Sequence, residues 1–169
     1  CKQRFVVISS RTAREMKNYT LGFIFTPEFN RVLLIHKTKP EWQAGKINGI
    51  GGKIEEGESP LECIVREVRE EAGLATAADK WIYLGEMGSD MWRVYVFATV
   101  YRGCMDDAKS PDEEKVEWFD PAALPGNIIN NLTWLVPLAL DKMRYGEFQD
   151  FSMRYHERPA YGRHQHLAS

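Results

Sequence analysis

Short apolar runs alternate with polar connections that carry glycine, proline or asparagine along this chain. Runs rich in β-branched and aromatic residues and bounded by turn residues are typical of β-strands. The turn Pro27-Glu28-Phe29-Asn30 separates the first two runs, which predicts a hairpin. In all, the pattern predicts strands within residues 19–26, 30–37, 80–87, 91–103, 111–120 and 147–157.

Residues 60–72 have the periodicity of an amphipathic helix. At about 100° per residue, one stripe collects the apolar side chains, those of Leu61, Ile64, Val65, Val68 and Ala72. Ser59 and Glu62 form an S-x-x-E capping box, and Pro60 suits the first helical position. Gly73 suits the left-handed position just after the last turn. Both ends of this helix are therefore predicted from local signals.

Residues 130–146 predict a second helix of about three turns, although Pro137 lies within it. Two helices among several strands predict an α/β sandwich with a mixed sheet rather than a doubly wound sheet, in which strands and helices alternate. A chain of 169 residues is long enough to bury the core of one domain, which we expect to span 1–169. The polar stretch from about residue 158 is expected to be a loose tail.

Composition narrows the possible partners. Charged residues make up 27% of the chain and the net charge is −2, so no basic field favours nucleic acid or a membrane surface. No apolar run approaches the ~20 residues of a membrane span. The three cysteines (Cys1, Cys63 and Cys104) are too scattered for a disulfide framework or a zinc site, which favours a reducing, cytoplasmic location. The oligomeric state stays open.

The strongest chemical signal is acidic. Residues 51–74 contain seven glutamates and three basic residues, which leaves a local charge of 3 − 7 = −4. On the predicted helix three of these glutamates lie at i, i+3 and i+4, where like charges repel by roughly 0.2–0.5 kcal/mol per pair. A solvated face is one explanation, but such faces usually mix signs, and Arg66 and Arg69 stand outside the cluster. The other is that Glu67, Glu70 and Glu71 hold a hard divalent cation such as Mg²⁺.

The loop from Asn48 to Lys53 precedes the acidic helix. Its glycines let the backbone pass close to a ligand because they carry no Cβ. It is neither a P-loop nor a dinucleotide fingerprint, since Ile47 and Ile54 stand where those motifs need glycine, serine or threonine. Phosphate binding here cannot rest on backbone amides alone, and a polyphosphate would be repelled by the acidic segment unless divalent cations bridge the two.

Residues 52–74 resemble the Nudix box, G-x5-E-x7-R-E-U-x-E-E-x-G-U, in which U is aliphatic. All the fixed positions match at the required spacing, namely Gly52, Glu58, Arg66, Glu67, Val68, Glu70, Glu71, Gly73 and Leu74. The resemblance implies a Nudix-type α/β/α sandwich with a mixed β-sheet and the Nudix loop–helix–loop. It also implies an enzyme that uses Mg²⁺ or Mn²⁺ to hydrolyse a nucleoside diphosphate linked to another moiety.

The same resemblance implies roles for individual residues. Arg66 would hold a box glutamate by ion pairing, Glu58 would brace the loop against the helix, and Gly52 and Lys53 would meet the substrate. Water would attack a phosphorus while the cations neutralise charge on the leaving group, and protein groups would orient that water and accept its proton. The metal ligands would be the Gly51 carbonyl and the carboxylates of Glu67, Glu70 and Glu71.

A wider likeness, through "RVLLIHK", "SPDEEKVEWFD" and "WLVPLALDKMRYGEF", is to MutT-type enzymes that cleave oxidised purine nucleoside triphosphates. It implies that Asn48 meets the base, although Asn-Gly is also a good turn dipeptide. Glu113 would assist the metal or the water, with Glu114 as the alternative and a plain surface acid as the other explanation. Eukaryotic members carry an acidic pair where this chain has Asn130 and Asn131, so Asn131 is expected to bind the base while a preference for an oxidised purine stays open.

The remaining candidates have two interpretations each. Trp42 would either stack on a base or plug its loop onto the core, and we expect the plug. Trp92 lies on a strand that lines the pocket in these enzymes, yet most aromatic residues on strands belong to the core. Cys63 falls near the glutamate side of the helix, and we expect a packed thiol, since Mg²⁺ avoids sulfur.

The leading hypothesis is a Mg²⁺-dependent nucleoside triphosphate pyrophosphohydrolase that releases a nucleoside monophosphate and pyrophosphate, with 8-oxo-dGTP or a related nucleotide as substrate. A second is a Nudix hydrolase for ADP-ribose or a dinucleoside polyphosphate. Gly88 stands where the ADP-ribose group tends to have proline, which lowers that option. A third, from another class, is a nucleotide-sensing module without catalysis. Such modules usually lose box glutamates, and this chain has lost none.

Overall fold

A computed structural model defines residues 15–146 and 148–156 of the chain. Its elements in chain order are β1 (Lys17–Phe25), β2 (Val32–His36), η1 (Glu41–Gln43), β3 (Ile47–Asn48), α1 (Pro60–Ala72), η2 (Ala78–Lys80), β4 (Ile82–Gly88), β5 (Trp92–Val100), η3 (Met105–Asp107), β6 (Val116–Phe119), α2 (Leu132–Tyr145) and β7 (Phe151–Arg154). The predicted strands and both helices are confirmed, and β3 is a short addition within a predicted loop. The expected tail lies outside the described residues.

The strands form one mixed sheet in the order β3-β2-β1-β5-β4-β7, and β6 pairs with β2 beside this path. The predicted hairpin is confirmed, because β1 and β2 pair antiparallel through Ile24 with Leu33 and Phe25 with Val32. Parallel pairing joins β1 to β5 along their whole length and β4 to β7, whereas β4 and β5 pair antiparallel. The sheet is therefore mixed, as the sequence predicts.

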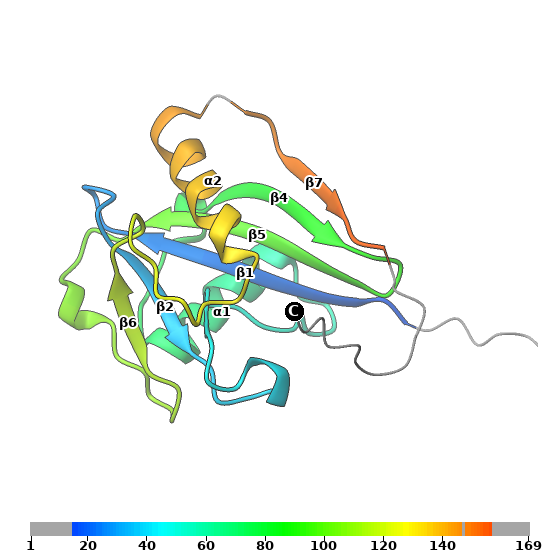
Figure 1. Cartoon of the computed structure of the whole chain (residues 1–169), viewed down its shortest axis with the longest axis horizontal. Helices are drawn as coiled ribbons and strands as arrows, with labels where there is room; N and C mark the ends of the chain where they lie inside the picture. Colours follow the sequence, from blue (N-terminus) through cyan, green and yellow to red (C-terminus); the bar gives the residue numbers. More distant parts are fainter. Residues whose placement is uncertain (1–14, 147, 157–169) are drawn as a thin grey trace, which may run out of the picture.

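The two helices cover opposite faces of this sheet, so the fold is an α/β/α sandwich (Figure 1). On one face Ile64, Val68 and Ala72 of α1 pack with Ile24 and Phe97 of the sheet. The other face buries one side of α2 against the alternate residues of β1, including Leu21, Phe23 and Phe25. Within the described residues, no helix has both the length and the apolar character to span a bilayer.

Helix α1 begins and ends where its caps predict. The Glu62 amide donates to Ser59 Oγ at 3.2 Å, and the Ser59 amide donates to Glu62 Oε2 at 2.8 Å. Gly73 has φ 67°, and a Cβ there would lie 2.8 Å from the Lys109 carbonyl oxygen. Of the predicted apolar stripe, Leu61 and Val65 are only partly buried, while Cys63 is fully buried beside the stripe.

The glycine loop, residues 48–53, pairs with the first part of β1. It lies on the same edge as β2, which pairs with β1 only at Ile24 and Phe25. Gly22 and Ile50 exchange backbone hydrogen bonds at 2.7 and 3.2 Å, and the Thr20 amide donates to the Gly52 carbonyl at 2.9 Å. A Cβ on Gly51 would lie 2.1 Å from the Thr20 carbonyl oxygen, so the strand and the loop touch backbone to backbone. This contact places the loop beside α1, and a pocket opens there.

Candidate functional site

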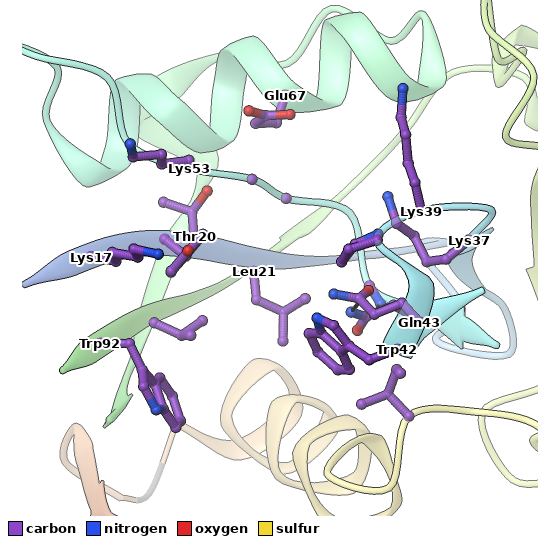
Figure 2. Close-up of a pocket in the computed structure, with 18 of the residues that line it drawn as sticks. Lys17, Thr20, Leu21, Lys37, Lys39, Trp42, Gln43, Lys53, Glu67 and Trp92 are labelled. Carbon is purple, nitrogen blue, oxygen red and sulfur yellow. Dashed lines mark hydrogen bonds between the residues drawn. The ribbon is translucent and has the colours of Figure 1, made fainter. Parts of the chain in front are cut away.

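A pocket of about 1150 Å³ lies beside β1, between the glycine loop with α1 and the start of α2. Figure 2 shows Glu67 on the α1 side of this pocket, Leu21 near its middle, and Trp42 and Trp92 on the side towards α2. One side is thus built from carboxylates and glycine backbone and the other from aromatic, apolar and amide side chains. Four lysines also line it, at positions 17, 37, 39 and 53.

Two of the three glutamates predicted to bind metal face this pocket. Glu67 and Glu71 lie one turn apart on α1 and line it. A Cβ on Gly52 would lie 2.3 Å from Glu67 Oε1, so glycine is the residue that leaves room for this carboxylate. Glu70 does not line the pocket and its side chain is 57% exposed. The predicted cluster therefore separates into a pocket-facing pair and an outer member.

Neighbouring cations compensate the burial of the pocket-facing pair only in part. Burial raises the pKa of Glu71 to about 7, although Lys37 opposes this rise. Glu71 Oε2 accepts a hydrogen bond from the Gly51 amide at 3.1 Å, and Oε1 lies 3.4 Å from Lys37 Nζ. Burial also raises the pKa of Glu67, against the hydrogen bond from Arg66. A cation between these carboxylates would offset the cost of burying them.

Arg66 lies at the centre of the acidic cluster, so the expectation that it stands outside the cluster is wrong. Its guanidinium pairs with Glu58 Oε1 at 2.7 Å, Glu67 Oε1 at 2.8 Å and Glu70 Oε2 at 3.0 Å. The ion pair to a box glutamate, which the resemblance implied, is present. Glu58 also accepts from the Glu55 amide at 3.0 Å, so it joins loop and helix, and the Arg66 hydrogen bonds lower its pKa to about 2.

The loop before β6 sends Glu114 inwards rather than Glu113. Neither residue lines the pocket, but Glu113 is exposed whereas Glu114 is only 6% exposed. Glu114 Oε1 accepts from the Thr38 amide at 2.7 Å, and Oε2 lies 2.5 Å from Lys37 Nζ. Burial would raise the pKa of Glu114, but the hydrogen bonds from Lys37, Thr38 and Lys39 lower it. The expectation for Glu113 is corrected, because these donors surround the next residue.

Lys37 is a site residue that the sequence reasoning missed. It lines the pocket and pairs with Glu71 and Glu114. One signal could have indicated it. Lys37 directly follows the apolar strand β2, and polar residues at strand ends commonly reach the adjoining cleft.

Asn48 and Asn131 both line the pocket, but they differ in their free hydrogen-bonding capacity. Asn48 Oδ1 accepts from the Gly49 amide at 2.8 Å and its Nδ2 donates to Gln43 Oε1 at 3.0 Å. Both polar groups of its side chain therefore already have local hydrogen bonds. Asn131 Oδ1 is buried without a hydrogen-bond partner among the described residues, where its Nδ2 reaches only Met87 Sδ at 3.7 Å. Asn130 is exposed and lies outside this pocket.

Trp42 does not plug its loop onto the core. Its side chain is 64% exposed while it lines the pocket, so that expectation is wrong. Trp92 lines the pocket too and packs against Tyr155 with ring centroids 5.4 Å apart. Lys53 lines it as expected. The expectation of a packed Cys63 is confirmed, since that thiol is fully buried.

The donors present fit a hard divalent cation. Mg²⁺ is usually held by one or two carboxylates, with water and substrate phosphates in the other positions, and Glu67 with Glu71 supplies that pair. The Gly51 carbonyl accepts no backbone hydrogen bond within the described residues, whereas the Gly52 carbonyl is taken by Thr20. No group of three or more histidine, cysteine, aspartate or glutamate side chains in the described residues is arranged as a ready-made metal site. Glu70 would become a third ligand only if its ion pair with Arg66 were broken.

Comparison with known proteins agrees with this geometry. Residues 16–137 match the NUDIX domain. The chain belongs to the Nudix family. It is 35% identical over 138 residues to the oxidized purine nucleoside triphosphate hydrolase of Danio rerio, across 76% of this chain and 83% of that protein. It is 31% identical over 124 residues to the human 8-oxo-dGDP phosphatase NUDT18, across 72% of this chain but only 38% of that protein.

Solved structures of Nudix proteins share the fold. The MutT NUDIX hydrolase from Burkholderia pseudomallei superposes with a TM-score of 0.62 at 18% identity, covering 73% of this chain and 98% of that one. A NUDIX-family hydrolase from Clostridium perfringens gives 0.58 at 21% identity, covering 75% and 97%. The expected MutT-like Nudix hydrolase and its mixed α/β fold are confirmed. The chain is therefore an enzyme of the nucleotide pyrophosphohydrolase class.

Proposed function

We propose that this Nudix hydrolase is a divalent-metal-dependent pyrophosphohydrolase that cleaves a purine nucleoside triphosphate, 8-oxo-dGTP or a related nucleotide, into the monophosphate and pyrophosphate. One observation carries the proposal. A single pocket joins the carboxylates of Glu67 and Glu71 to a side lined by Trp42, Trp92 and Asn131. This is the layout that a molecule with a phosphate chain and an aromatic base requires. The name of the Danio rerio relative supports the choice of substrate.

In this proposal Mg²⁺ or Mn²⁺ is held by Glu67, Glu71 and the Gly51 carbonyl, and Glu70 joins them by leaving Arg66. When bound, the cation would supply positive charge that stabilises the leaving group and lowers the pKa of a bound water. Arg66 and Glu58 keep the carboxylates and the loop in register through their ion pair. Each ligand can be tested separately, because in the metal-free structure Glu70 lies outside the pocket whereas Glu67 and Glu71 line it.

The chain's own residues then bind and orient the nucleotide. Lys53, which is exposed and lines the pocket, meets the phosphate chain beside Gly52. Asn131 offers its unpartnered Oδ1 to an N–H group on the base, because a buried acceptor without a donor costs about 1–3 kcal/mol until a donor arrives. Asn48 contributes less to the base than expected from sequence, because Gly49 and Gln43 already use it.

A nucleoside diphosphate is a second candidate substrate. The relatives of this chain include proteins named 8-oxo-dGDP phosphatase, and the exposed pocket lysines (Lys17, Lys39 and Lys53) can bind a shorter phosphate chain as well. The products distinguish the two substrates, since a nucleoside diphosphate yields inorganic phosphate rather than pyrophosphate.

We also propose a cytoplasmic location, which the few scattered cysteines support. Fractionation of cells expressing the tagged chain would test it.

Turnover of a nucleotide panel with Mg²⁺, analysed by chromatography, tests the function. The panel holds dGTP, 8-oxo-dGTP, 8-oxo-dGDP, ADP-ribose and a dinucleoside tetraphosphate. Glu71→Gln should lower kcat/KM at least about a hundredfold, since it removes a charged ligand that acts on the transition state, and Glu70→Gln should lower it less. Glu56→Gln is the matched control, because Glu56 is an exposed box-segment glutamate outside the pocket.

The alternatives have distinct outcomes in the same panel. Turnover of ADP-ribose or the dinucleotide alone would favour the second enzymatic hypothesis. Binding of nucleotides without any product would favour the sensing module. Normal turnover in Glu71→Gln would overturn the ligand assignment while leaving the substrate question answered by the panel.

A further inference from the structure

Gln43 lines the pocket but has no role in the proposed function. It lies in η1, and Figure 2 shows it beside Trp42 and away from Glu67. Its backbone is fixed on both sides, since its amide donates to the Pro40 carbonyl and its carbonyl accepts from the Lys46 amide, both at 2.9 Å. Its side chain is half-buried. Gln43 is therefore held at a fixed point of the pocket wall.

Two linked amide side chains determine which end of the Gln43 amide faces the pocket. The Gly49 backbone N–H can only donate, and it donates to Asn48 Oδ1 at 2.8 Å. The other end of the Asn48 amide is therefore the donor Nδ2, which lies 3.0 Å from Gln43 Oε1. Turning the Gln43 amide round would place two donors, Asn48 Nδ2 and Gln43 Nε2, against each other. A backbone donor thus fixes the orientation of both amides.

The end of Gln43 that remains is a donor without a partner. Its Nε2 makes no hydrogen bond within the described residues, so both N–H groups are available. Asn131 Oδ1, in the same pocket, is an acceptor without a partner among those residues. The base side of the pocket thus presents one amide as a donor and another as an acceptor. Guanine offers an exocyclic oxygen to such a donor, whereas adenine has an amino group in its place.

We propose that Gln43 is a specificity-determining residue whose Nε2 donates a hydrogen bond to an exocyclic carbonyl oxygen of the purine base. Asn48 is a positioning residue that holds Gln43 in this orientation and does not itself contact the base. The inference rests on the proposed function in that it takes the ligand to be a purine nucleotide. It favours bases with an exocyclic oxygen, such as guanine and 8-oxoguanine, over adenine.

Dissociation constants of 8-oxo-dGMP, dGMP and dAMP, measured by calorimetry without metal, test the contact. Gln43→Glu keeps an acceptor for Asn48 and replaces the donor by a second acceptor of the same shape. It should weaken 8-oxo-dGMP about tenfold or more and dAMP less than about threefold. An equal loss for dGMP assigns the contact to O6 of the base, and an unchanged dGMP assigns it to O8. Ala44→Glu is the matched control, because it adds the same charge at an exposed neighbour outside the pocket.

Asn48→Asp tests how the orientation of Gln43 is fixed. The new carboxylate still accepts from Gly49 but also accepts on the Gln43 side, so the Gln43 amide should turn and present Oε1 to the pocket. This variant should weaken 8-oxo-dGMP about as much as Gln43→Glu does. In a Gln43→Leu background, Asn48→Asp should change the ratio of the dAMP and 8-oxo-dGMP constants less than about twofold, because residues that act through one contact are not additive.

Four outcomes would overturn the inference. A ratio of constants that is unchanged in Gln43→Glu, or changed as much by Ala44→Glu, would remove the base contact of Gln43. Equal weakening of all three nucleotides by Gln43→Glu would leave Gln43 only a structural role in its loop. A full effect of Asn48→Asp in the Gln43→Leu background would assign the base contact to Asn48 instead.

Binding of monophosphates separates failure of this inference from failure of the proposed function. A chain that hydrolyses no nucleotide, yet binds the three monophosphates with the expected changes in the variants, would refute the function and keep the inference. A chain that cleaves 8-oxo-dGTP, with a preference over dATP that Gln43→Glu leaves unchanged, would do the reverse.

Discussion

Replacing Arg66 by methionine should destabilise the metal-free protein strongly. Methionine keeps most of the length and the apolar stem of the side chain but removes the guanidinium that touches Glu58, Glu67 and Glu70. The variant therefore leaves those carboxylates facing one another without the cation between them. The hydrogen bonds from Arg66 Nη2 to the Lys53 carbonyl at 3.2 Å and to Cys63 Sγ at 3.4 Å are lost as well.

The size of the effect follows from how exposed each partner is. Glu70 is 57% exposed, so its pair contributes at most about 1 kcal/mol. Glu58 and Glu67 are each 13% exposed and Arg66 is 25% exposed, which lies nearer the buried case, where breaking a pair costs about 3–5 kcal/mol. We expect a loss of about 3 kcal/mol in the free energy of unfolding, or about 6–12 °C in Tm for a chain of this size.

Thermal melts with and without millimolar Mg²⁺ measure both the loss and its cause. Arg69→Met is the matched control, because Arg69 is exposed on the same helix and has no ion pair within the described residues; it should change Tm by about 1 °C or less. Mg²⁺ should raise the Tm of Arg66→Met more than that of the wild type, since a cation that binds only the folded state stabilises it and the variant has more uncompensated charge. Equal melting of the two arginine variants, or an equal response to Mg²⁺, would refute this account.

Two further predictions concern groups around the same cluster. Glu58 has a pKa of about 2 in the fold against an ordinary 4.5, so it stabilises the protein above pH 4.5 and this contribution disappears as the pH falls towards 2. Glu58→Gln should therefore lower Tm at pH 7 and lose less Tm than the wild type between pH 5 and pH 2, and parallel Tm curves would contradict it. Burial raises the pKa of the Cys63 thiol to about 11, so in a Cys1→Ser background at pH 8 iodoacetamide should modify exposed Cys104 and spare Cys63 until the protein is unfolded. Intact-mass measurement of two modified thiols in the folded protein would show that Cys63 is accessible.

Helix α1 was predictable to the residue because its signals are local. The capping box joins Ser59 to Glu62 within one turn, and Gly73 closes the other end. No long-range contact is needed to place either cap. By contrast, β3 pairs with β2 and has a parallel bridge to Ile128, a residue far along the chain. The two residues of β3 carry no periodicity that would separate them from the loop around them.

The errors at Arg66 and at Glu113 have one physical origin, which is that the contacts of a side chain with distant parts of the chain are not visible in the sequence pattern. A helical projection places Arg66 one turn from Glu70, at i and i+4, so that pair was available from the sequence. The contact of the same side chain with Glu58, in the loop before the helix, was not. The choice between Glu113 and Glu114 depends on amide donors at Thr38 and Lys39, more than seventy residues earlier.

The charges around the acidic cluster also limit how the cation binds. Without metal, Arg66 neutralises the outer side of the cluster and Lys37 approaches Glu71 from the pocket side, so a cation must displace or repel charges already present. Among the glutamates of the described Nudix box, only Glu67 and Glu71 line the pocket, which is too few ligands for a dedicated cage and typical of Mg²⁺ that shares its coordination with substrate phosphates. Cation and nucleotide should then bind as a coupled pair, each tightening the other by the same factor. Arg66 and Lys37 stabilise the acidic helix while no metal is bound. The negative charge of the nucleotide then favours the binding of a metal ion in place of these ion pairs.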